Sequence, residues 1–193
     1  MWLNQLSAPS ATPISLSEAK AHLRVLTNDE DTLITALIAA ATSLLEGRNG
    51  VLGRALVTQQ WEHRIDAFPT NGFIELPLPP LQTVEAVKYI DDAGAEQTVD
   101  SSDYVVDAEL LVGRIRPAYN VTWPSTRCEP HAVRIEFTAG YGVAADVPDP
   151  LKQAMLLLIG HFYLNREATS EKTIKGLPFA VEALISGYQF RPV

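Results

Sequence analysis

Apolar residues recur at helical spacing near the start of the chain. Ser15 and Glu18 have the spacing of a capping box, which satisfies free backbone donors where a helix begins. A second apolar stripe with a period of 3.6 residues follows, and Asn49-Gly50 closes it. The members of this stripe are Leu33, Ile34, Leu37, Ile38, Ala41, Leu44 and Leu45. The pattern predicts two helices between positions 1 and 50.

The same periodicity returns after position 148. Asp149-Pro150 predicts a helix start, with the aspartate as N-cap and the proline at the first helical position. One apolar stripe contains Leu151, Met155, Leu158 and Phe162, and a second contains Ala154, Leu157 and His161. A helix with two apolar faces is buried on both, in a bundle or against another subunit. The polar residues 165–176 predict a loop, and a short helix is expected from Pro178 to Tyr188.

The middle of the chain favours strands. Residues 57–65 alternate between a mostly apolar face and a fully polar face. Further short strands are predicted at 73–76, 84–90, 97–99, 104–106, 110–115 and 133–137, between turn-forming segments. Such a series is typical of a small antiparallel sandwich or barrel.

These patterns together predict an α+β fold. We expect a helical bundle formed by the N- and C-terminal helices, with an inserted antiparallel β sandwich or barrel. The expected bundle comprises residues 1–53 and 148–193, and the expected insertion residues 54–147. This arrangement is favourable because chain ends usually lie close together and tolerate an insertion between them.

Charge narrows the range of functions. The 193 residues include 15 Lys and Arg against 23 Asp and Glu, a formal net charge of -8. The block 51–147 carries 7 basic and 14 acidic residues, so -7 of that charge lies in the expected insertion. Such a chain is poorly suited to wrapping DNA, which needs clustered Lys and Arg. No secretory signal or membrane-spanning run is evident, so we expect a soluble protein made in a cytoplasm and no membrane partner.

The residues that could carry chemistry are few. Cys128 is the only cysteine, which excludes an intramolecular disulfide and a multi-cysteine metal site. It lies shortly before His131, and a Cys–His pair can activate a thiolate, but the segment is typical of a loop between strands. The histidines, His22, His63, His131 and His161, form no metal-binding motif. We therefore expect no catalytic residue, no metal site and no cofactor.

Two other local patterns have plain structural interpretations. Gly47, Gly50 and Gly53 follow a helix and lack the lysine of a phosphate loop, so they indicate a helix stop and a turn. The acidic residues 91–109 lack the spacing of a calcium loop, and they favour a solvated sheet edge that discourages aggregation.

Alternatives to a structural protein stay open on the residues alone. One is a small enzyme that uses Cys128 or His131. Another is a carbohydrate- or ligand-binding β module with Trp61, Trp123 and Tyr141 as an aromatic platform. Large apolar residues near both termini, Trp2 and Phe190, have nothing nearby in sequence to cover them, so these ends either fray or dock into a partner.

An ordered set of segments resembles phage head–tail connector proteins, also called adaptors or head-completion proteins. The early segment is ISLSEAKAHLRVLTNDEDTLITALIAAATSLLE, and the closing segments are GYG…VPDPLKQAMLLLIGHFYLNREA and PFAVEALISGY. The middle pieces TQQWEHRIDAFP, LPLPPLQTVEAVKYID and YVVD…GRI are similar to the longer branch of that family, to which adaptors of gene transfer agents belong.

The resemblance implies a structural role. Family members form a ring, typically of twelve copies, that joins the portal to a tail-side stopper or terminator protein and lets double-stranded DNA pass without specific binding. The implied location is the head–tail junction of a virion or virus-like particle, after synthesis in a bacterial cytoplasm. The family's C-terminal segment engages the portal, and by position this implies contacts from Tyr188, Gln189, Phe190 and Arg191.

The residues add two expectations to this role. A ring needs an interface between different faces of neighbouring copies, and the doubly apolar helix offers Leu157, His161 and Leu164 for it. The acidic surplus suits a conduit whose wall does not hold DNA, and Asp91, Asp92 and Asp103 are candidates for that wall.

Overall fold

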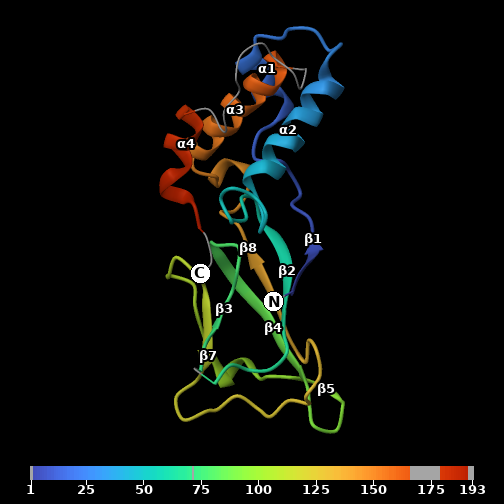
Figure 1. Ribbon diagram of the computed structural model, residues 1–193, viewed down its shortest axis with the longest axis vertical. Helices are drawn as coiled ribbons and strands as arrows, with labels where there is room; N and C mark the ends of the chain where they lie inside the picture. Colours follow the sequence, from blue (N-terminus) through green and yellow to red (C-terminus); the bar gives the residue numbers. More distant parts are fainter. Residues whose placement is uncertain (1, 71, 166–178, 191–193) are drawn as a thin grey trace. The chain divides into compact units, whose positions relative to one another are not determined.

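The computed structural model describes residues 2–70, 72–165 and 179–190. The chain divides into two compact units, and each is built from two separate stretches of sequence (Figure 1). The sheet unit comprises Met1–Ser10 and Thr58–Tyr141, and the helical unit comprises Ala11–Val57 and Gly142–Val193. The fold is therefore mixed, with helices and antiparallel sheets in separate parts of the chain, as the α+β prediction requires at this coarse level.

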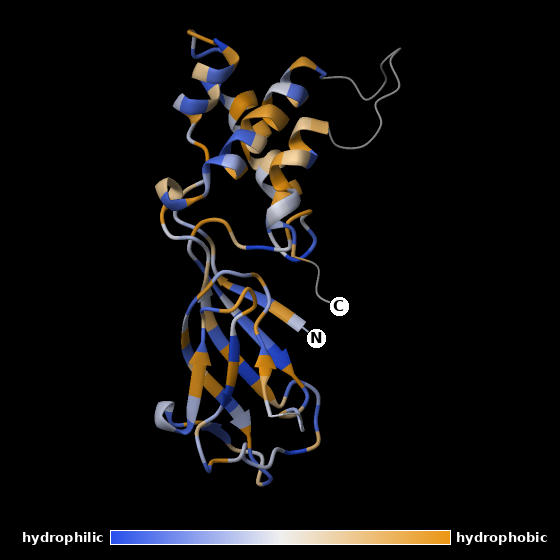
Figure 2. Ribbon diagram, turned by 90° about the vertical axis from the view of Figure 1, so that its left-hand side faces the viewer, coloured by the Kyte–Doolittle hydropathy of each residue, from blue (hydrophilic) through white to orange (hydrophobic). Residues whose placement is uncertain are grey.

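The helical unit contains α1 (Leu16–Leu23), α2 (Asp31–Leu45), α3 (Asp149–Leu164) and α4 (Phe179–Ile185). Helix α3 packs against the other three, so helices from both ends of the chain share one core. The fully or nearly fully buried side chains of its two longest helices are Ile34, Ile38, Ala41, Leu45, Leu151, Ala154, Met155, Leu158 and Ile159. Figure 2 shows hydrophobic residues gathered where these helices face one another.

The predicted helix starts are reproduced with one shift. At α1, the Ser15 hydroxyl accepts a hydrogen bond from the Glu18 N–H, and the Glu18 carboxylate accepts one from the Ser15 N–H, which completes the capping box. The Ser15 hydroxyl also donates a hydrogen bond to the Glu18 carboxylate. This bond first, and that from the Ser15 N–H second, lower the pKa of Glu18. At α3, the N-cap is Pro148 and not Asp149, so the aspartate and Pro150 both lie inside the first turn.

Two antiparallel sheets form the sheet unit. The larger sheet has the order β1-β2-β8-β4-β5, and the smaller has the order β3-β7-β6. The strands are β1 (Trp2–Ser7), β2 (Gln59–Ile65), β3 (Ile74–Glu75), β4 (Leu81–Ile90), β5 (Glu96–Thr98), β6 (Tyr104–Asp107), β7 (Arg114–Pro117) and β8 (Val133–Ala139). Central strand β8 pairs with β2 on one side and β4 on the other. The strands described form open sheets and no closed barrel.

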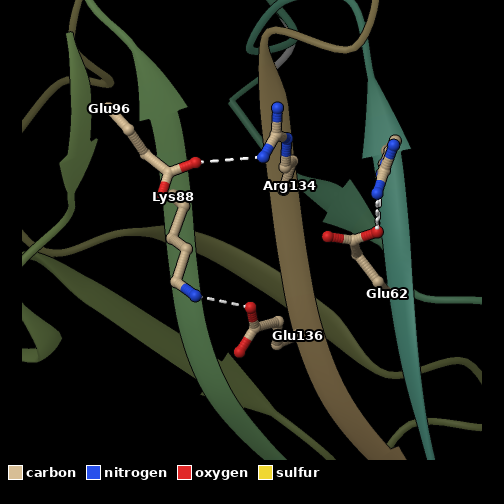
Figure 3. A network of polar contacts seen from close by, with 6 residues as sticks. Glu62, Lys88, Glu96, Arg134 and Glu136 are labelled. Carbon is tan, nitrogen blue, oxygen red and sulfur yellow. Dashed lines mark hydrogen bonds and ion pairs between the residues drawn. The ribbon is translucent and has the colours of Figure 1, made fainter. Parts of the chain in front are cut away.

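The larger sheet has one apolar and one charged face. Along β8, Val133, Ile135 and Phe137 are buried, while Arg134 and Glu136 alternate with them on the other side. The charged face carries ion pairs between Lys88 and Glu136 (2.5 Å), Arg134 and Glu96 (3.0 Å), and Arg64 and Glu62 (2.5 Å) (Figure 3). This two-sided pattern is what the alternation in residues 57–65 predicts for one of these strands.

The register of this sheet places two glutamates opposite each other, and the ion pairs offset their repulsion. Glu62 on β2 lies directly opposite Glu136 on β8, and like charges in that position destabilise a sheet. Lys88 on β4 and Arg64 on β2 supply the compensating cations. The hydrogen bond to Glu136 raises the pKa of Lys88 and so favours its charged form.

The N-terminal residues depart from the sequence-based expectation. The bundle was expected to begin at residue 1, but Trp2–Ser7 form β1 and pair with β2, which places them in the sheet unit. This short segment has no turn and no strand next to it in sequence, so the local pattern does not indicate that it forms a strand. The hydrogen-bonding partner that makes it a strand lies far along the chain, at positions 60–64.

A second departure concerns the strand expected at residues 110–115. Strand β7 begins only at Arg114, and Leu110 and Leu111 are exposed. Gly113, at the end of this loop, has no room for a side chain, because a Cβ there would lie 2.3 Å from Leu81 Cδ2. Its carbonyl accepts a hydrogen bond from the Leu76 N–H. The apolar residues Leu110 and Leu111 therefore lie in a loop. Strands β3 and β6 pair with this part of the chain only from Arg114 onwards.

We predict that Lys88→Met lowers the free energy of unfolding by about 1 kcal/mol at neutral pH, because it leaves Glu62 and Glu136 opposed with one cation fewer. Adding Glu136→Gln to this variant should recover most of the loss. Chemical denaturation of the single and double variants measures the coupling, and additive effects would contradict the prediction.

The same pair predicts a dependence on alkaline pH. Because the folded-state pKa of Lys88 lies above the ordinary value of 10.5, its stabilisation is fully present below that value and is lost as the pH rises through the folded-state pKa. The stability gap between the wild type and Lys88→Met should therefore close in that range.

Candidate functional site

The C-terminal segment is held against a loop of its own unit. The Phe190 N–H donates a hydrogen bond to the Leu52 carbonyl at 2.8 Å, and the Arg54 Nε donates one to the Tyr188 carbonyl. Arg54 is only 7% exposed. A buried guanidinium needs acceptors, so the docked segment satisfies part of the hydrogen-bonding requirement of the loop.

Gly53 makes this close approach possible. Its φ is +63°, in the left-handed region, and a Cβ at this position would lie 2.1 Å from the Phe190 carbonyl oxygen. A side chain would therefore collide with the docked backbone as well as strain its own. The glycine series at 47, 50 and 53 indicated a helix stop and a turn, but its spacing carried no signal that the chain end lies on it.

The resemblance assigns portal contact to Tyr188, Gln189, Phe190 and Arg191, and the described residues among them differ in burial. The Tyr188 and Phe190 side chains are half-buried, the Gln189 side chain is exposed, and Arg191 lies outside the described residues. Nothing nearby in sequence covers this end, as the sequence indicates, but the loop 52–54, which is distant in sequence, binds the backbone of its described part. The segment is thus held at two backbone positions while Gln189 projects to solvent.

Helix α3 presents only part of its second apolar stripe to solvent. Ala154 is fully buried, whereas Leu157 and His161 are half-buried and Leu164 is 81% exposed. The amide of Asn165 lies 3.3 Å from the His161 Nδ1. The exposure therefore increases along the stripe towards the C-terminal end of the helix.

The aromatic platform of the ligand-binding alternative is not assembled. Trp123 stacks on Phe68 with ring centroids 4.7 Å apart, and the Phe68 ring makes an edge contact with that of Tyr89. Tyr89 is the strand partner of Val133 on β8. Trp61 pairs with Phe137, further along the same strand, at a spacing of roughly 13 Å from Val133. The rings of Trp61, Trp123 and Tyr141 are half-buried, and those of Trp61 and Trp123 lie in different parts of the sheet unit.

In the enzyme alternative, the described contacts of His131 do not include Cys128. Cys128 is exposed, while the His131 ring lies against Trp2 with centroids 5.8 Å apart and its Nδ1 lies 4.0 Å from an Asp66 oxygen. Among the described residues, no group of three or more His, Cys, Asp or Glu is placed to hold a metal ion. In the same part of the chain, no helix is long and apolar enough to cross a membrane.

Comparison with known proteins decides among the alternatives. A family model for the head completion protein (HCP) matches residues 12–183. The chain belongs to the head completion protein family.

Solved structures of similar chains extend over the whole molecule. A chain in the neck of an empty GTA particle, computed with C6 symmetry, is 29% identical, with a TM-score of 0.81. A chain in the virion of a native gene transfer agent (GTA) particle is 28% identical with the same TM-score, and one in a native GTA neck computed with C12 symmetry is 26% identical with a TM-score of 0.75. Each alignment covers 100% of this chain and 97% of the other. The comparison with curated protein sequences gave no match.

Head completion proteins are structural components of particles and not an enzyme family. The resemblance noted in the sequence segments is therefore confirmed, and so is the expectation that the chain is not an enzyme.

We predict that Gly53→Ala releases residues 186–190 from the loop, because the new methyl group would occupy the place of the Phe190 carbonyl. Limited carboxypeptidase digestion and hydrogen exchange should show faster cleavage and faster exchange in this segment. Gly47→Ala is the matched control: Gly47 also has a left-handed φ, of +84°, but nothing lies within 4 Å of its added Cβ. Equal effects of the two substitutions would contradict a specific docking contact.

Proposed function

We propose that this head completion protein forms a ring at the head–tail junction of a phage-like particle, where it joins the portal to the tail and lets DNA pass. The observation that carries the proposal is the similarity over the full chain to chains of the GTA neck, at a TM-score of 0.81. The C6 and C12 symmetries of those necks are the reason for proposing a closed ring, with twelve copies as the expected number.

The proposed architecture is a helical bundle with an inserted β sandwich. It is supported by the shared core of helices from both chain ends and by buried residues on both sheets, among them Ile115 on the smaller sheet and Phe137 on the larger. In the ring, the open end of α3 with Leu157, His161 and Leu164 meets a different face of the next copy. The exposure of Leu164 supports this assignment, because a large apolar side chain in water is stabilised by burial in a contact.

The proposed portal contact is made by Tyr188, Gln189, Phe190 and Arg191. The anchoring of the segment by Leu52 and Arg54 supports it, because a segment held in advance loses less conformational entropy when it binds. The tail-side contact is to a stopper or terminator protein, as the resemblance implies.

The acidic surplus of the sheet unit fits a passage for DNA that does not grip it. Hydrogen bonds from the Gln97 side chain and from backbone N–H groups, that of Ala95 foremost, lower the pKa of Asp91 and so favour its charged form. Like charges repel the phosphate backbone, which prevents tight binding to the passing duplex.

Portal binding tests the proposal directly. We expect native mass measurements of the protein with its cognate portal to show several copies bound, whether or not the protein alone is monomeric. Replacing Phe190 with Ala and Gln189 with Glu should weaken this binding about tenfold or more. Gln153→Ala, an exposed change on α3, serves as the control. Failure of the wild-type protein to bind the portal would refute the connector role.

Charge reversal tests the conduit. Asp92 and Glu109 are exposed acids in the block 91–109, whereas Asp91 and Asp100 cap local turns and are left unchanged. Asp92→Lys with Glu109→Lys should reduce DNA delivery by assembled particles, because new cations hold the duplex. Glu182→Lys on α4 is the control for a charge reversal in the helical unit. Particles that assemble normally and deliver DNA at the wild-type rate would contradict the proposed acidic wall.

A further inference from the structure

The larger sheet has two open edges. Strand β1 ends it on one side and β5 on the other, and no other strand in the described part of the chain pairs with either outer side. An open edge presents unpaired backbone N–H and C=O groups, so it is a template for pairing with another chain.

The β1 edge lacks the charged residues and the proline that protect many such edges. Its sequence, WLNQLS, contains no charged residue and no proline. A register shift occurs between Gln5 and Ser7, but the residues before it pair regularly with β2. Trp2 is 44% exposed and lies over the Arg64 guanidinium at 4.4 Å, so the edge also carries a large aromatic surface of a type enriched in interfaces.

The β5 edge is different in both length and charge. It has three residues, begins at Glu96, and is flanked by Asp91 and Asp100. Two β5 edges brought together would oppose carboxylates, and repulsion between them discourages that contact. The β1 edge brings no carboxylate, so electrostatics permits a contact between β1 and β5.

We infer that the β1 edge of one copy pairs with the β5 edge of the next copy, so that the larger sheet continues from subunit to subunit. The inference rests on the proposed ring, because rotational symmetry requires two different surfaces of the chain to meet. The two opposite edges of one sheet meet that requirement without any rearrangement of the strands.

Strand direction specifies the geometry of the contact. All neighbours in the larger sheet are antiparallel, and the sheet has five strands, so β1 and β5 run in the same direction. Copies related by a small rotation keep nearly the same orientation, and the contact between β1 and β5 is therefore parallel. A parallel pairing over so short a strand is weak, which suits an interface that forms only when the portal gathers the copies.

Chemical cross-linking on the assembled protein tests this pairing. In a Cys128→Ser background, Asn4→Cys and Thr98→Cys place one thiol on each edge. Both positions are on the charged face, because Asn4 pairs with Glu62 and Thr98 pairs with Lys88. With the cognate portal present, a short bismaleimide should convert the double variant into a ladder of covalent multimers. An equimolar mixture of the two single variants should stop at dimers, because each copy then carries one thiol.

Each outcome of this experiment decides something. A ladder from the double variant supports the inference. Dimers from Asn4→Cys alone would mean that β1 pairs with β1 about a two-fold axis, which overturns it. Rings that are visible by electron microscopy but give no ladder would also overturn it, while leaving the proposed function intact. If neither rings nor portal binding occur with the wild-type protein, the proposed function fails and the inference falls with it.

Discussion

The pairing of β2 with β8 is the contact on which the rest of the molecule depends. It joins Gln59 to Ala139 at one end and Ile65 to Val133 at the other, and so closes the long stretch of chain that runs between these strands. Helix α2 ends before β2 begins, and α3 starts after β8 ends. The ladder therefore brings together the two points at which the chain leaves the sheet, and the helices from both chain ends can share one core.

Closing so long a loop is entropically unfavourable, and several features of the central strands offset that cost. The buried row of Val133, Ile135 and Phe137 gains from removal from water. On the opposite face, cations from β2 and β4 lie next to the opposed carboxylates of Glu62 and Glu136 and offset their repulsion. A slip of the register by one position would move charged side chains into the core, so the alternation selects a single pairing.

The surfaces that we propose for assembly lie in both units. In the helical unit they are the exposed end of α3 and the segment that Leu52 and Arg54 hold in place. In the sheet unit they are the uncharged β1 edge and the acidic β5 edge. Two distinct kinds of contact are useful in a particle component. An anchored segment can bind a different protein, whereas paired edges connect identical copies.

The sequence by itself determined the helices, most of the strands and the family. Helical periodicity placed α2, the capping box of Ser15 and Glu18 placed the start of α1, and the alternation in residues 57–65 placed β2, because each of these signals is local. The ordered segments that resemble head-completion proteins anticipated the family match.

The decisive features of the candidate site were not local. Strand β1 exists because β2, a strand far along the chain, supplies its hydrogen bonds, and the C-terminal segment is covered because Gly53 leaves room for the Phe190 carbonyl. Neither requirement is visible in the pattern of the segment itself, since each depends on a backbone that approaches from elsewhere in the chain, and only the tertiary structure brings those backbones together.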